Sequence, residues 1–166
     1  TRSFGNQVDT LYHAENMGNS VSFPRISPDG RFLMVTLSNH ATFPIWHQEA
    51  DLWMLDLQEG NKLIRLDTLN SSSVESYHSW SNNGRWIVFS SRRMDGLYTR
   101  PYIAYVGVDG TVGKPFILPQ SRGDFYNECM NSFNIPELVK GKVDVNRYQL
   151  IQKVLDERKE QVKSGI

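Results

Sequence analysis

The sequence Ser-Pro-Asp-Gly-Arg at residues 27–31, followed by the apolar run at 32–36, decides the fold. The same pattern returns at residues 81–85, where Ser-Asn-Asn-Gly-Arg precedes the apolar run at 86–90. A Gly that follows Asp or Asn supplies the positive φ that a tight hairpin turn needs. Each copy therefore predicts a strand, a tight turn and a second, apolar strand.

A second pair of short strands is expected after each copy, at residues 51–66 and 102–118, and each pair surrounds a turn that contains Gly. Two units of four short strands, about 50 residues apart, are typical of β-propeller blades. The alternative is an antiparallel sandwich in which the similarity is accidental. We predict an all-β fold: a partial β-propeller of about two four-stranded antiparallel blades, at residues 21–70 and 71–120, plus a C-terminal helix.

The two ends of the chain differ from these repeats. Two blades cannot close a ring, so either further blades precede them or copies of the chain associate. The pattern at residues 4–12 is typical of a strand, so residues 1–20 are expected to contain the outer strand of a preceding blade. Residues 121–143 are rich in Asn, Pro and Gly and predict an irregular tail. Apolar residues at helical spacing then predict an amphipathic helix over 144–166, with Asp144 as its N-cap. We expect its apolar face to pack against a sheet, the alternative being a helix that binds a partner. This face consists of Val145, Tyr148, Ile151, Val154 and Leu155.

Composition excludes several classes of partner. Lys and Arg together number 18, as do Asp and Glu, so the formal net charge is 0. A general binder of nucleic acid would need a basic excess, and no apolar run approaches the roughly 20 residues that span a bilayer. Cys129 is the only cysteine, so the sequence offers no internal disulfide and no thiolate metal cluster. We expect no nucleic-acid partner and no membrane span in this chain.

The sequence also lacks the motifs of catalysis. It contains neither a Gly-x-Ser-x-Gly elbow nor a Gly-rich phosphate loop. His40 and His47 lie in a loop without metal-ligand spacing, and the turn at Asp95 lacks the alternating Asp ligands of a calcium loop. We therefore predict that the chain is not an enzyme and carries no cofactor or metal.

Candidate binding residues gather in the long connections between expected strands. In a four-stranded up-and-down blade, the short turns lie at one end, and the middle connection and the link to the next blade lie at the other. Long ordered loops on a rigid scaffold are where binding residues concentrate. Arg92 and Arg93 could alternatively pair with Glu75 and Glu49 in structural ion pairs. The candidate contacts are Trp46, His47, Glu49, Glu75, Tyr77, His78, Arg92, Arg93 and Arg100.

The turn signature at residues 27–31 and the run at 87–96 resemble the repeats of TolB-type β-propellers, and the resemblance covers residues 21–119. In the second copy, Asn82 and Asn83 replace Pro and Asp, which keeps the turn. The resemblance implies the C-terminal part of a longer bacterial protein of the cell envelope, in the periplasm or associated with the outer membrane.

On this basis the chain is predicted to be a protein-interaction scaffold for an envelope partner. We also expect it to self-associate through exposed blade edges. One alternative is the propeller portion of a larger hydrolase or peptidase. Another is a module that binds carbohydrate or a small ligand through Trp46, Tyr77 and Tyr98.

Overall fold

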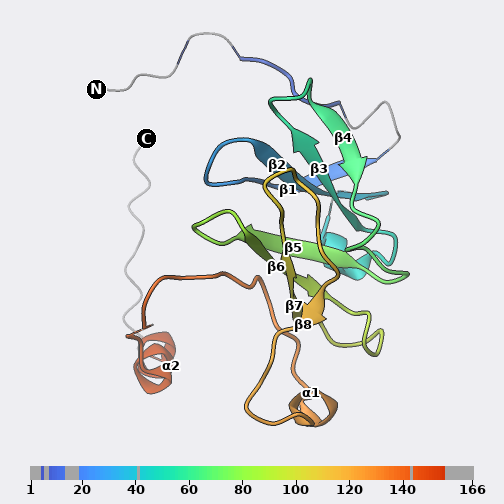
Figure 1. The fold of residues 1–166 in the computed structure, drawn as a ribbon. Helices are drawn as coiled ribbons and strands as arrows, with labels where there is room; N and C mark the ends of the chain where they lie inside the picture. The colour runs from blue at the N-terminus through green and yellow to red at the C-terminus, as the bar shows by residue number, and fades with distance from the viewer. Residues whose placement is uncertain (1–4, 6–7, 14–18, 41, 143, 156–166) are drawn as a thin grey trace, which may run out of the picture.

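The computed structural model of the protein describes residues 5, 8–13, 19–40, 42–142 and 144–155. Two four-stranded antiparallel sheets dominate it, and in each sheet the strands follow one another in chain order (Figure 1). The first sheet contains β1 (Ser20–Ile26), β2 (Phe32–Ser38), β3 (Asp51–Asp56) and β4 (Lys62–Arg65). The second contains β5 (Glu75–Trp80), β6 (Trp86–Ser91), β7 (Arg100–Tyr105) and β8 (Phe116–Ile117). The prediction of an all-β chain with two four-stranded antiparallel sheets is confirmed.

The β1–β2 turn and the β5–β6 turn are held in the same way. In the first turn, Asp29 Oδ1 accepts hydrogen bonds from Ser27 Oγ at 2.5 Å and from the backbone N of Arg31 at 3.1 Å. In the second turn, Asn83 Oδ1 accepts the two equivalent bonds, from Ser81 Oγ at 2.7 Å and from a backbone N at 3.1 Å. Asn therefore replaces Asp without changing the turn, as predicted.

The first strand of each sheet carries the same irregularity. The register of β1 shifts around Phe23, which has a φ of 52°, and the register of β5 shifts around Tyr77, which has a φ of 53°. Tyr77 follows Phe23 by 54 residues, and Gly84 follows Gly30 by the same 54 residues. A bulge at a matching position indicates that the two sheets are copies of one four-stranded unit.

The main core lies between the two sheets. Side chains of β2 and β3 meet side chains of β6 and β7, with Leu66 and Leu69 from the connection between the sheets. Alternate residues of a strand point to opposite faces, which explains why Phe32 and Met34 reach this core while Val35 and Leu37 do not. The long apolar strands at 32–38 and 86–91 therefore hold the sheets together.

The outer face of the second sheet is crossed by the tail. After the short helix α1 (Phe125–Glu128), the segment at residues 131–138, which we name the crossing segment, passes over three strands in turn. Phe133 N donates to Thr99 O just before β7, at 3.0 Å. Ser90 Oγ of β6 and Ser79 Oγ of β5 donate to carbonyls of the crossing segment at 2.9 and 2.8 Å. The tail thus covers the outer face of the second sheet, which was not predicted from the sequence. The self-association of the chain stays a prediction.

The C-terminal helix α2 (Arg147–Leu155) confirms the expected element but not its details. Its N-cap is Asn146, whose Oδ1 accepts a hydrogen bond from Tyr148 N at 2.9 Å, so the assignment of Asp144 was wrong. The packing prediction was also wrong, because its apolar residues are 50 % to 84 % exposed. The helix lies apart from the sheets, and the crossing segment already covers the nearest one (Figure 1). The predicted part at 156–166 lies outside the described residues.

The strand predicted within residues 1–20 can be compared with the structure only in part. Residues 5, 8–13 and 19 form no strand, and the rest of the strand expected within 1–20 lies outside the described residues. Tyr12 packs on the cluster of Val35, Leu37 and Leu55, on the outer face of the first sheet. In the part of the chain that the structure describes, no helix has the length and apolar character that a membrane span requires.

Candidate binding site at the long-connection end

The sheets have two unlike ends. The short turns lie at one end, which we name the short-turn end. There, Arg31 Nη1 beside the β1–β2 turn donates a hydrogen bond to Val108 O beside the β7–β8 turn, at 2.9 Å. The connections at residues 39–50, 66–74 and 92–99 leave the sheets at the opposite end, which we name the long-connection end. This arrangement is the one expected from the order of the strands.

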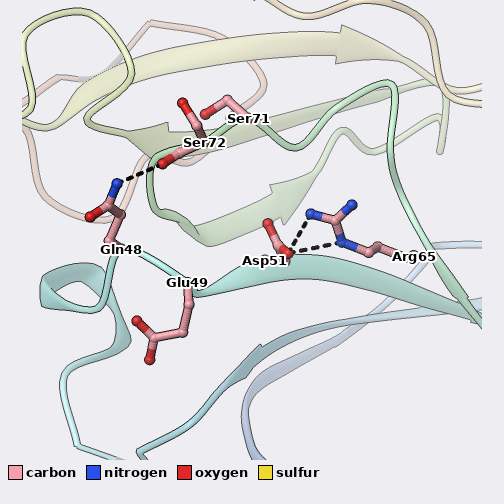
Figure 2. Close-up of a pocket in the computed structure, with 6 residues that line it drawn as sticks. All are labelled: Gln48, Glu49, Asp51, Arg65, Ser71 and Ser72. Atoms are coloured by element: carbon pink, nitrogen blue, oxygen red, sulfur yellow. Dashed lines mark hydrogen bonds and ion pairs between the residues drawn. The ribbon is translucent and has the colours of Figure 1, made fainter.

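Two pockets lie side by side at the long-connection end, and Gln48 lines both. The first pocket, of about 450 Å³, contains a carboxylate–guanidinium pair and a hydrogen bond from Gln48 Nε2 to Ser72 O at 2.9 Å (Figure 2). The second pocket has about 320 Å³. The first is lined by Gln48, Glu49, Asp51, Arg65, Ser71 and Ser72. The second is lined by Trp46, Gln48, Ser73, Val74, Arg92 and Gly96.

Trp46 and Arg92 form the exposed wall of the second pocket. Trp46 ends a short 3-10 helix (Pro44–Trp46) that is anchored by buried Ile45, which leaves the indole 69 % exposed. The guanidinium carbon of Arg92 lies 3.9 Å from the centre of the Trp46 ring, within range of a cation–π contact. Burial holds the pKa of Arg92 below its usual range. Both are predicted site residues, and the structure brings them together.

Glu75 and Arg93 form a structural ion pair. Glu75 is fully buried, and its carboxylate accepts hydrogen bonds from Ser71 N, Ser71 Oγ and Ser91 Oγ at 2.7 to 2.9 Å. Arg93 Nη2 donates to the same carboxylate and to Leu69 O, at 2.8 and 2.7 Å. The alternative weighed from the sequence, pairing of Glu75 with one arginine, therefore describes this structure, and both groups are engaged within the fold.

His78 and Arg100 also serve the fold. His78 is buried between the sheets, where its Nε2 lies 3.0 Å from Met34 O and burial lowers its pKa to about 4. Arg100 is 1 % exposed and donates to three backbone carbonyls between Tyr126 and Asn131. It fixes the start of the tail against the second sheet, so neither side chain faces either pocket at the long-connection end.

The remaining candidates are spread around the site. His47 is half-buried, with Nε2 2.9 Å from Thr42 O and Nδ1 4.0 Å from the carboxylate of Glu49. Glu49 lines the first pocket but points away from the pair beside it (Figure 2). Tyr77 packs edge-on against Phe23, at the matching bulges of β1 and β5. The aromatic set proposed for carbohydrate therefore has Tyr77 engaged within the fold.

Sequence reasoning missed the ion pair of the first pocket. Asp51 Oδ2 accepts hydrogen bonds from Arg65 Nε and Nη2 at 2.9 and 2.7 Å (Figure 2). Arg65 also pairs with Asp67. Burial raises the pKa of Asp51, and the bonds from Arg65 partly oppose that shift. The pairing of β3 with β4 brings these groups together; only the strand register could have revealed them.

Metal chemistry has no support in this region: among residues 5, 8–13, 19–40, 42–142 and 144–155, no three His, Cys, Asp or Glu side chains group as metal ligands would. Comparison with known proteins gives no relative from which a role could be inferred, since no protein-family model and no curated protein matches the chain.

Proposed function

We propose that the chain is a non-catalytic protein-binding module, two blades of a larger TolB-like β-propeller, and that its long-connection end holds the partner. The observation that carries this proposal is the 69 % exposed Trp46 beside a pocket, with Arg92 stacked on it. Trp and Arg are the residue types most enriched at the energetic centres of protein interfaces. An exposed indole held on a rigid 3-10 turn is suited to bury against a partner.

The propeller part of the proposal is supported by the repeated four-stranded unit. Both sheets have strands in chain order, matching bulges and a shared core between their faces. These are features of consecutive blades. The resemblance at residues 27–31 supports the TolB-like family and the bacterial cell envelope, in the periplasm or at the outer membrane.

The non-catalytic part is supported by the positions of Glu75 and His78, two candidate contacts whose side chains could otherwise act as an acid or a base. Glu75 has its oxygens occupied by Ser71, Ser91 and Arg93, and His78 is buried in the core. A general acid or base must reach the proton that it transfers. Neither group meets that condition in this fold.

A photo-crosslinking experiment tests the proposal. A benzophenone amino acid replaces Gln48, which is exposed and lines both pockets, and the chain is irradiated in a bacterial envelope fraction. We expect one discrete adduct, identified by mass spectrometry, that is lost on Trp46→Ala. The matched control is Phe116→Ala, which removes a 47 % exposed aromatic ring from β8 and should leave the adduct. An adduct that survives Trp46→Ala, or no adduct at all, contradicts the proposal.

A further inference from the structure

Arg92 and Arg93 are neighbours in the sequence, but of the two only Arg93 forms an ion pair with a described residue. Arg93 lies 2.8 Å from Glu75 and donates to a backbone carbonyl as well. The guanidinium of Arg92 has neither a carboxylate within 4.0 Å nor a hydrogen bond to another described residue, and its Nε is buried. Asp95 is a carboxylate that acts on Arg92 electrostatically, but it forms its ion pair with Arg100, at 3.6 Å. The Arg92 guanidinium therefore keeps hydrogen-bond donors that an incoming anion could accept.

The surroundings of Arg92 favour an incoming negative charge. The six residues that line the second pocket include one cation, Arg92, and no carboxylate. The first pocket differs, because Glu49 and Asp51 there outnumber Arg65. The Trp46 ring lies 3.9 Å from the guanidinium carbon and restricts the Arg92 side chain. Because the side chain is already restricted, it loses less conformational entropy when a ligand binds.

We infer that the second pocket recognises a carboxylate, and that Arg92 binds an Asp or Glu side chain of the partner. The inference rests on the proposed function, because it places this carboxylate on a protein. A planar guanidinium can donate two parallel hydrogen bonds to one carboxylate. A phosphate group is usually recognised by a cluster of arginines, and the neighbouring Arg93 is already neutralised by Glu75.

Peptide selection provides the test. Phage-displayed random peptides are selected against the immobilised chain, against Arg92→Gln and against Arg85→Gln. Arg85 is a half-buried arginine beside the β5–β6 turn, at the opposite end, and serves as the matched control. We expect Asp and Glu to be enriched among peptides selected on the unmodified chain and on Arg85→Gln, but not on Arg92→Gln.

Synthetic peptides then measure the contact itself. Changing the selected acid to its amide should weaken binding to the unmodified chain about tenfold, as expected for a charge-assisted hydrogen bond, and should not affect binding to Arg92→Gln. Arg92→Lys keeps the charge without the planar fork, and should show a smaller loss on the same amide change. Circular dichroism and thermal melting confirm that each variant is folded.

Three results would overturn the inference. The first is a selection without acidic enrichment, and the second is an amide change that weakens binding to Arg92→Gln as much as to the unmodified chain. The third is tighter binding when phosphoserine replaces the acid, which would assign the pocket to phosphate. The proposed function fails separately, when the adduct at position 48 does not depend on Trp46.

Discussion

Two arginines at opposite ends of the sheets, Arg31 and Arg92, differ in how completely they are paired. At the short-turn end, Arg31 donates to Asp56 from Nε at 3.0 Å and from Nη2 at 2.7 Å, and its Nη1 reaches Val108 O. At the long-connection end, Arg92 has no such partner among the residues that the structure describes, and Trp46 beside it is exposed. Arg31 is therefore used within the fold, whereas Arg92 keeps hydrogen-bond donors for a ligand.

The turn carboxylates show how the short turns use their own acidic groups. Hydrogen bonds from Ser27 and Arg31 lower the pKa of Asp29, and bonds from Thr111 lower the pKa of Asp109. Each carboxylate is used to close its own turn, as Asp in tight turns commonly is. An acidic side chain on the surface is a candidate contact only after its internal partners are known.

The largest effect is expected from Glu75, which lies at the long-connection end but belongs to the fold. Glu75→Ala should destabilise the chain by about 3–5 kcal/mol, because it leaves Arg93 without its carboxylate in a half-buried setting. Urea denaturation measures this loss. Glu49→Ala is the matched control, with a side chain that is 40 % exposed, and should change stability by less than about 0.5 kcal/mol. Equal losses for the two variants would break the distinction between fold and site.

The pH dependence of stability tests whether His78 also belongs to the fold and not to the binding site. Burial lowers the pKa of His78 to about 4, from an ordinary 6.5, so the unfolded chain binds more protons between these two values. The free energy of unfolding is therefore highest above pH 6.5. It falls as the pH drops from 6.5 towards 4, by about 3 kcal/mol in all.

Denaturant titrations at several pH values in this window measure the slope. His78→Gln should flatten it, whereas His47→Gln, which changes a half-buried histidine of the loop, should leave it as it is. A slope that His78→Gln does not alter would remove His78 as its source and would contradict its neutral burial.

Local features of the fold could be predicted from the sequence because they depend on nearby residues. A Gly with positive φ and an Asp or Asn before it define a turn within five residues, and an apolar run after it defines a buried strand. The helix could be predicted from spacing for the same reason. Its N-cap could not, because Asp144 and Asn146 are both good caps and differ only in where the helix begins.

The candidate site could be predicted only in part, because its partners are distant in sequence. Neighbouring residues at the end of a strand point to opposite sides, so one of Arg92 and Arg93 reaches Glu75, and the register of β5 with β6 decides which. Arg100 binds backbone carbonyls of the tail, and a carbonyl carries no residue identity that a sequence pattern could reveal.

The smallest effect is expected at the short-turn end, where the repeat itself supplies the comparison. Asn83 holds the second turn with the same two hydrogen bonds that Asp29 makes in the first. Asp29→Asn should therefore change the free energy of unfolding at pH 7 by less than about 0.5 kcal/mol. Asp29→Ala removes both acceptors and should destabilise the chain by about 1 kcal/mol, since the Ser27 hydroxyl and the Arg31 amide lose their partner.

Urea denaturation of the two variants side by side separates the hydrogen bonds from the charge. Both variants lose the carboxylate, but only Asp29→Ala loses the Oδ1 acceptor, so their difference reports the bonds that close the turn. A large loss for Asp29→Asn would mean that the charge of Asp29 matters; Arg85, beside the other turn, is one cation that acts on it. In that case the short-turn end would be tied together by electrostatics between the sheets, and its two turns would not be independent copies.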